Sequence, residues 1–341
     1  MGIAKENDSN GSGFLKQIRN IGILQSSSGG ILIVILLIGT VLSLTTKDFF
    51  TMTNFNVLVR GFSITIIVGL AQMVVIAIGG MNLAVGAIGG LVGALIGSLM
   101  DKMGVSPIIA IPMGCLAGMI CGLWDGWVIT RLGVSGVTSF LVTLAGGSLF
   151  TGATLGITRA NPFYHLPTSF KIIGNFNVFG ISGLLFIMLV IALLVDLLFR
   201  RLGLGRQILA VGGNIRAASL SGIAVNRVTI IAFMISGLLS AAAAILLTAR
   251  LGSAQPSIGS DWLLASFAAP IIGGTRLAGG KVTVIGTVLG GILLTMIGNG
   301  IIFLNLSIYW TVFIQGLIIM GAVGLDRIRT ISAENLERSL P

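Results

Sequence analysis

Long apolar stretches recur along this chain of 341 residues, separated by short polar breaks. A helix needs about 20 predominantly apolar residues to cross a bilayer, and several of these stretches reach that length. Lipid cannot hydrogen-bond the backbone, so a spanning segment must be a helix or part of a closed barrel, and the two-residue alternation of barrel strands is missing here. Only 9% of the residues are charged, against roughly a quarter in a soluble domain. The sequence therefore predicts an all-α polytopic membrane protein.

We expect about ten membrane segments, one of which is unusually short. The short segment covers residues 262–274. The others cover residues 29–45, 57–79, 83–100, 105–129, 134–155, 178–199, 228–248, 283–303 and 307–324. Together they predict a transmembrane domain over residues 29–324, with polar tails at residues 1–28 and 325–341.

The basic residues predict the orientation. An even number of segments puts both termini on one side, and with that side inside, the inner loops and tails hold twelve Lys and Arg against five in the outer loops. Because basic residues favour cytoplasmic loops, both termini are expected in the cytoplasm. The long outer loop is then residues 156–177 and the long inner loop residues 200–227. Arg60 lies too close to an apolar end to be assigned to either side.

Glycine is unusually frequent, with 50 residues in the chain. One set recurs at every fourth position of an apolar stretch, which lets helix backbones approach closely and is interpreted as a packing face. Its members are Gly114, Gly118, Gly122 and Gly126.

Residues 78–86 and 272–280 share the pattern IGGxxLAxG at a break between segments. Glycine-interrupted segments in both halves of a transporter indicate its solute path, because unwound backbone is tolerated in a membrane only where protein or a cavity surrounds it. Coincidence in a glycine-rich chain is the alternative.

No catalytic or metal-binding motif is present. Residues 274–281 resemble a phosphate-binding loop, but the second glycine is one residue too far and Val282 stands where Ser or Thr would hold Mg²⁺. A single histidine, His165, cannot build a metal cluster. We therefore expect no enzyme, no metal site and no cofactor in this chain. The net charge of +10 does not indicate nucleic-acid binding either, because the basic residues lie between apolar runs rather than in one patch.

Asp125 is the one acid well inside a predicted span. A charge at the membrane centre costs at least about 3 kcal/mol on insertion scales, so such a residue is a functional candidate. An ion-coupled secondary transporter that uses Asp125 is therefore the main alternative function, and an enzyme embedded in lipid is a third. Asp125 lies near the inner end, however, four residues before Thr130, where interfacial water is within reach.

The inner loop carries the most specific signal. Residues 204–223 read LGRQILAVGGNIRAASLSGI, which closely resembles the G-R-x-x-x-A-x-G-x-N-x-x-A-A-x-x-x-G-I stretch of sugar-type ABC importer permeases, the relatives of the ribose permease. The resemblance continues through residues 268–280 and the Asn299–Gly300 pair, and it covers most of residues 57–326.

The resemblance implies a ten-helix fold similar to that of the vitamin B12 importer permease, with broken helices in both halves, in a bacterial inner or plasma membrane. It implies three partners besides lipid: an ABC ATPase subunit that binds ATP and Mg²⁺, an extracytoplasmic solute-binding protein, and a second copy of this permease or a homologous one. The cargo it implies is a small polar solute such as a monosaccharide or polyol.

The resemblance also implies that residues 205–222 enter a groove on the ATPase. The expected coupling residues are Gly205, Arg206, Gly213, Asn214, Arg216, Ala217, Ala218 and Gly222.

The sequence departs from the family pattern at three places. Asn82 stands where the family usually has an acid, Asp125 where it often has Asn, and residues 138–140, Thr-Ser-Phe, where it has Pro-Pro-Phe. These changes bear on the solute rather than on fold or coupling.

We expect the solute path to be lined by Asn82, Phe140, Thr275 and Asn299. Asn82 and Thr275 follow the two IGG breaks, and their amide and hydroxyl groups can exchange hydrogen bonds with a neutral polyhydroxylated solute without trapping it. The alternative is that both residues cap broken helix ends.

Three basic residues stand in otherwise charge-poor outer loops. Arg159, Lys171 and Arg250 are expected to pair with acidic residues of the solute-binding protein.

Overall fold

The computed structural model describes residues 27–46 and 48–304 and scattered positions beyond. Those positions are Ser307, Trp310, 312–314, 316–317, 320–321 and Gly324. The expected tails therefore lie outside the described residues, except for Ser27 and Ser28, which begin the first helix, and the last expected segment is described only in part.

Helices make up most of the described chain. They are α2 (Ser27–Thr45), α3 (Met52–Ala77), α4 (Val85–Asp101), α5 (Pro107–Leu132), α6 (Gly136–Thr158), α7 (Thr168–Asn175), α8 (Leu184–Arg200), α9 (Gly203–Gly213), α10 (Ile215–Leu220), α11 (Val225–Leu251), α12 (Trp262–Ile272) and α13 (Val284–Phe303). The short strands β1 (Asn177–Val178) and β2 (Ile181–Ser182) form an antiparallel hairpin.

Every membrane segment expected between residues 29 and 303 has a helix at its place. Among the described helices, α3, α5, α6, α11 and α13 are long and apolar enough to cross a membrane, while α4 and α12 are shorter apolar helices. The prediction of an all-α polytopic membrane protein is confirmed, with the small β1–β2 hairpin as an addition.

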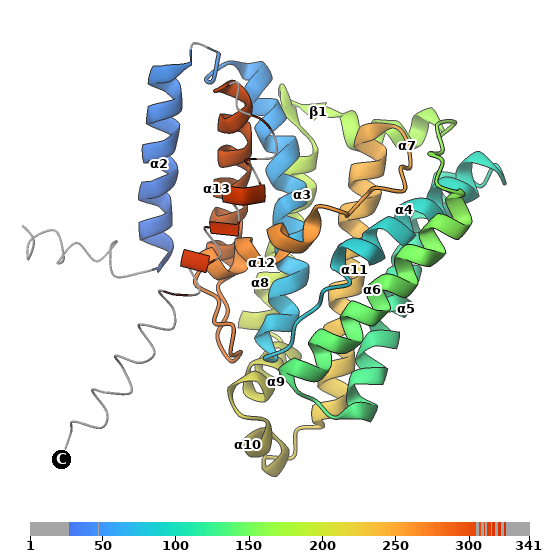
Figure 1. Ribbon diagram of the computed structural model, residues 1–341, viewed down its shortest axis with the longest axis vertical. Coiled ribbons are helices and arrows are strands. Elements are labelled where there is room, and N and C mark those ends of the chain that lie inside the picture. Colours follow the sequence, from blue (N-terminus) through green and yellow to red (C-terminus); the bar gives the residue numbers. More distant parts are fainter. Residues whose placement is uncertain are drawn as a thin grey trace, which may run out of the picture.

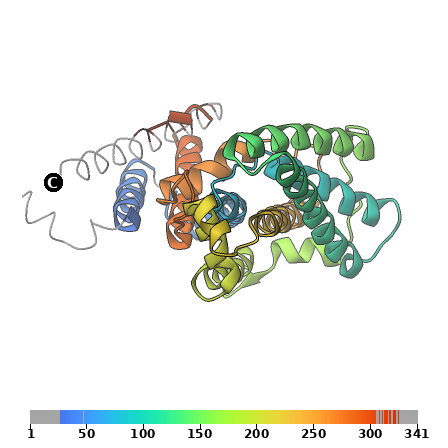
Figure 2. The same cartoon turned by 90° about the horizontal axis from the view of Figure 1, so that it is seen from below.

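The helices α3 and α11 form the centre of the bundle (Figure 1). α3 is buried over 78% of its most apolar stretch, whereas α6 is buried over only 17%. Seen from below, α2 and α13 lie on one side of this centre, and α4, α5 and α6 lie on the other (Figure 2). The core is therefore built around α3, and α6 belongs to the periphery.

The two long loops lie at opposite ends of the molecule. α7 and the β1–β2 hairpin cover one end, and α9 and α10 form the other (Figure 1). At the α7 end, Phe163 pairs with Ala254 through two backbone hydrogen bonds of 3.0 and 2.9 Å. The His165 backbone N–H donates to Asp101 Oδ1 at 2.9 Å. These bonds hold the connection between α6 and α7 against the end of α4, at Asp101, and against the segment that follows α11, at Ala254.

The most extensive helix contact in the described structure joins α5 and α11. A Cβ added at Gly118 would overlap the carbonyl oxygen of Gly237, and one added at Gly122 would overlap that of Phe233. The two backbones therefore touch, which confirms the interpretation of the four glycines of α5 as a packing face.

The substitution Gly122→Val is expected to force α5 away from α11, because the Phe233 carbonyl is backbone and cannot rotate aside. Overpacking of this kind costs about 1–3 kcal/mol, so the melting temperature of the purified permease in detergent should fall by at least about 3 °C. Gly152→Val on α6 is the matched control, because an added Cβ meets nothing within 4 Å there. Equal melting temperatures for the two variants would contradict the close α5–α11 contact.

Candidate functional site

The two IGG repeats interrupt the helical bundle. Residues 78–84 connect α3 to α4, and residues 273–283 connect α12 to α13. Each connection leaves the preceding helix through a glycine with positive φ, Gly79 at +76° and Gly274 at +84°. This backbone region favours glycine, which explains why both helices stop at the same motif.

The two interruptions contact each other. The Gly280 backbone N–H donates to the Ala77 carbonyl oxygen at 3.0 Å. A Cβ added at Gly79 would lie only 3.2 Å from the carbonyl oxygen of Ala278. Segments from the two halves of the chain thus meet near the α9–α10 end of the bundle (Figure 1).

Asn82 and Thr275 both make local bonds within these interruptions. Asn82 is fully buried, and its side chain donates to Ser236 Oγ at 3.0 Å and accepts from the Ala84 N–H at 2.9 Å. Thr275 is also buried, and its Oγ1 accepts from the Thr283 N–H at 3.4 Å. Both side chains satisfy backbone near a helix end, as the capping alternative anticipates.

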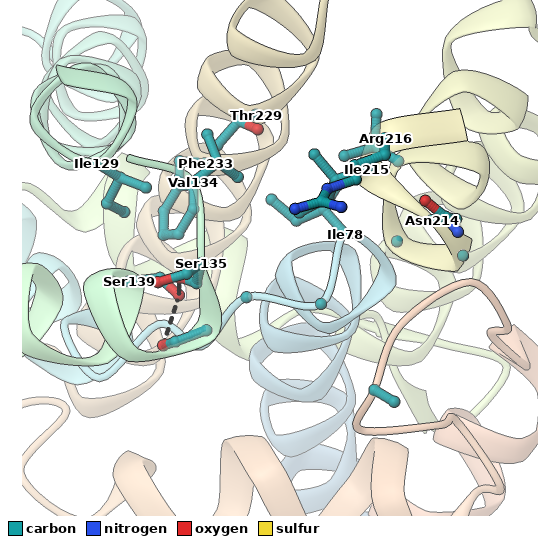
Figure 3. Close-up of a pocket in the computed structure, with 17 residues that line it drawn as sticks. Ile78, Ile129, Val134, Ser135, Ser139, Asn214, Ile215, Arg216, Thr229 and Phe233 are labelled. Carbon is teal, nitrogen blue, oxygen red and sulfur yellow. Dashed lines mark hydrogen bonds between the residues drawn. The ribbon is translucent and has the colours of Figure 1, made fainter. Parts of the chain in front are cut away.

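A cavity of about 320 Å³ opens beside the first interruption (Figure 3). It lies between the start of α6, the α9–α10 connection, α11 and the IGG turns, and its wall includes Ser135, Ser139, Asn214, Arg216 and Thr229. Figure 3 shows the Arg216 guanidinium extending between Ile78 and Phe233. The wall is mostly uncharged, with hydroxyl and amide groups and this one cation.

The predicted coupling residues divide into a buried and an exposed set. Gly205 and Ala218 are buried, and Gly205 packs on the backbone of Leu198. Asn214 caps α10, because its Oδ1 accepts from the Ala217 N–H at 3.0 Å. The exposed residues are accessible to a partner protein. They are Arg206, Gly213, Asn214, Arg216, Ala217 and Gly222.

At the opposite end, Lys171 of α7 and Arg250 of α11 lie close together. The Gly174 backbone packs directly on that of Arg250, and the Asn175 side chain donates to the Arg250 carbonyl at 3.4 Å. Arg159 lies apart from them, exposed at the end of α6. The structure therefore brings together two of the three predicted docking residues.

Sequence reasoning left Arg60 of α3 unassigned, but the structure places it close enough to Arg250 for the two charges to interact. Among the described residues neither arginine forms an ion pair, and Arg60 Nε is buried without a hydrogen-bond partner. Two arginines without ion-pair partners, on two helices that pack together, mark Arg60 as a candidate site residue. The spacing of residues in the sequence does not show that the two arginines interact.

The other two expected path residues lie elsewhere. Asn299 exchanges two hydrogen bonds of 3.2 and 2.9 Å with Asn54, joining α13 to the start of α3. Asn299 also lines a second cavity of about 690 Å³ together with Arg250 and Asp261. Phe140 is 40% exposed on α6. The four expected path residues thus do not form one cluster in this conformation.

Asp125 is fully buried in α5, next to Gly146 of α6. Neither carboxylate oxygen has a hydrogen-bond partner among the described residues. The described part of the chain holds no group of three or more His, Cys, Asp or Glu side chains that could bind a metal ion.

Known proteins resemble this chain over nearly its whole length. A family model described as the permease component of a branched-chain amino acid transport system matches residues 53–323. The ribose import permease protein of Bacillus subtilis is 34% identical over 92% of this chain and 96% of its own length. For the D-allose transport system permease protein of Escherichia coli these values are 33%, 91% and 94%. The autoinducer 2 import system permease protein of Yersinia pseudotuberculosis is 26% identical over 93% of this chain and 89% of its own length. No solved structure matches the chain.

The fold and these matches define a multi-pass membrane permease subunit of an ATP-driven bacterial importer. The chain belongs to the family of permease components that includes the ribose and allose import permeases. It is a transport subunit and not an enzyme, and a separate ATPase subunit hydrolyses ATP.

The bonds of Asn82 predict an order among its variants. Asn82→Ala removes the acceptor for Ala84 and the donor to Ser236, which should cost about 1–3 kcal/mol. Asn82→Asp keeps the side-chain oxygen that accepts from the Ala84 N–H. Position 82 lies just before α4, where the helix dipole favours an acidic side chain. We expect the melting temperature of Asn82→Asp in detergent to lie nearer that of the unaltered permease than that of Asn82→Ala. The reverse order would contradict the capping role.

Proposed function

We propose that this permease imports a monosaccharide or polyol, driven by an ABC ATPase and supplied by an extracytoplasmic solute-binding protein. The observation that carries the proposal is that α9, in the loop expected to meet the ATPase, contacts Ala77, where α3 ends and the first interruption begins, and Gly280 of the second interruption. The relatives named for ribose and allose support a sugar as the solute. The hydroxyl and amide groups around the inner cavity suit a neutral polyhydroxylated solute.

The proposed assembly pairs two permease copies, each with ten membrane helices as in the vitamin B12 permease, with residues 307–324 as the tenth. The solute path runs between the copies. The exposed face of α6 supports this arrangement, because such a large apolar surface needs lipid or another protein against it. Its exposed apolar side chains include Val137, Leu141, Leu144, Leu149 and Leu155.

We place the α9–α10 end in the cytoplasm, and both termini with it. Most of the basic side chains in the described residues support this orientation, because cytoplasmic ends carry the excess of Lys and Arg. Those at the α9–α10 end, by their place at helix ends and in the connections, are Arg131, Arg200, Arg201, Arg206, Arg216, Arg227, Arg276 and Lys281, against Lys102, Arg159, Lys171 and Arg250 at the other end. Residues 29–324 are then the permease domain between two cytoplasmic tails.

The exposed coupling residues of α9 and α10 contact the ATPase in this proposal, and the cavity beside them is the inner end of the path. Ser135 and Ser139 offer hydroxyls to a leaving solute there. Asn82 and Thr275 contact the path only after the helices move, because both are buried here. Phe140 and Asn299 are the other two residues proposed to line it.

Replacing Gly213 and Ala217 by Leu should block ATPase docking, since both positions are exposed on the coupling loop. The test uses proteoliposomes with the permease, its ATPase and its binding protein, and measures ATP-driven uptake of labelled ribose and allose together with solute-stimulated ATP hydrolysis. We expect both activities to be lost in the double variant and kept in Ser169→Leu, an exposed change at the opposite end. Normal stimulation in the double variant would overturn the coupling role, and absent uptake of any sugar by the unaltered complex would overturn the proposed function.

Reversing the charge of Arg159, Lys171 and Arg250 should weaken docking of the solute-binding protein. Each exposed pair contributes under about 1 kcal/mol, so the triple Glu variant is expected to bind up to about 100-fold more weakly at low ionic strength, with a smaller difference in high salt. Swapping Lys for Arg and Arg for Lys at the same positions preserves charge and is the control. Unchanged affinity of the Glu variant at low salt would exclude these residues from docking. Arg60→Glu, measured alone, tests whether the arginine beside Arg250 belongs to the same surface.

A further inference from the structure

Three glycine-containing backbones meet where α9 reaches the two interruptions. A Cβ added at Gly212 of α9 would overlap the Ala77 carbonyl oxygen and lie 2.6 Å from the Gly280 nitrogen. A Cβ added at Gly279 would lie 2.6 Å from the Gly79 nitrogen and 2.9 Å from the Gly212 carbonyl oxygen. No side chain lies between the coupling loop and either interruption at this point.

The contact is also tied by a hydrogen bond. The Gly280 N–H donates to the Ala77 carbonyl oxygen at 3.0 Å, the same oxygen on which Gly212 packs. Behind this contact, α9 is anchored by Ile208 and Val211, both fully buried in the core. The end of α3, the part of the α12–α13 connection around Gly280 and the last turn of α9 therefore meet in one backbone contact.

Backbone packing of this kind transmits movement differently from side-chain packing. A layer of side chains can absorb a shift by changing rotamers, whereas touching backbones must move together or separate. As long as this contact holds, a displacement of α9 would displace the end of α3 and the α12–α13 interruption with it.

We propose that Gly212 is a positioning residue in a rigid backbone junction with Gly79 and Gly280, through which movement of α9 reaches both interruptions of the solute path at once. The inference rests on the proposed role of α9 and α10 in ATPase coupling, and it adds the route by which that movement reaches the path. Coupling between distant sites requires an element that can adopt two distinct positions and that both sites influence. In this proposal that element is the junction of Gly212, Gly79 and Gly280.

The first test compares Gly212→Ala with Gly203→Ala in the complete complex of permease, ATPase and binding protein. Both changes add one methyl group to a glycine of α9, but only Gly212 meets backbone, and an added Cβ at Gly203 meets nothing within 4 Å. In Gly212→Ala we expect basal ATP hydrolysis and bound ATPase to persist while uptake and solute-stimulated hydrolysis fall by at least about tenfold. Gly203→Ala should match the unaltered complex. Equal coupling in the two variants would overturn the proposal.

The second test needs no change in the junction, so it decides the matter even if Gly212→Ala does not assemble. Spin labels are attached to cysteines at Gln207 and Lys281, both exposed, in one permease copy that lacks Cys115 and Cys121. The distance between these labels should be the same with and without ATP. The distance from Gln207 to Val137, which is 71% exposed at the start of α6 across the inner cavity, should change.

A Gln207–Lys281 distance that changes with ATP would overturn the junction, because α9 would then move apart from the interruption. A Gln207–Val137 distance fixed in every nucleotide state would also overturn it, since α9 would have no movement to transmit. Failure of the unaltered complex to take up any sugar would instead count against the proposed function, while uptake that Gly212→Ala leaves intact would count against the junction alone.

Discussion

Lipid offers no hydrogen bond to a peptide group, so each interruption of the bundle has to satisfy its own backbone within the protein. In the first interruption, α6 supplies the partners. The Met81 N–H donates to Ser139 Oγ at 3.2 Å, and the Leu83 N–H donates to Thr143 Oγ1 at 3.0 Å. The Gln72 side-chain amide, in the orientation that satisfies both of its ends, pairs with the backbone of Asn82 at 2.8 and 3.1 Å. The backbone groups of Met81, Asn82 and Leu83 in the loop between α3 and α4 thereby find partners within the protein.

The second interruption combines backbone bonds with the hydroxyls of Thr275 and Thr283, which lie within the interruption itself. The Arg276 N–H donates to the Lys281 carbonyl at 3.1 Å, and the neighbouring Gly280 N–H reaches across to Ala77. The two IGG repeats are thus alike in sequence, but the glycine with positive φ is the first of the pair in one repeat and the second in the other. The first interruption is held by hydroxyls of α6 and by Gln72 of α3, and the second contacts the end of α3. Movement at the end of α3 would therefore involve both interruptions.

Hydropathy was sufficient to predict the membrane segments between residues 29 and 303, because a helix that crosses a bilayer must present about 20 apolar residues. It missed α7, whose eight residues include Lys171 and polar side chains and stabilise the end of α11 rather than cross the bilayer. The contact between the IGG repeats is non-local, so no window of sequence contains it. The interaction of Arg60 with Arg250 is also non-local, because the two arginines lie on different helices. The sequence around Arg60 therefore does not predict it.

The internal bonding near the interruptions bears on how such a permease treats its solute. Asn82, Ser139 and Thr143 carry the polar side chains at the first interruption, and each is bonded within the protein. A solute passing here would have to compete with those bonds, so the net gain from any one contact is small. In the proposed assembly, weak binding in the path would favour release of the solute and would leave discrimination between solutes to the binding protein before docking. Residues 204–223 and 268–280 are the two stretches in which the sequence most resembles the family, and they meet where α9 contacts the α12–α13 connection.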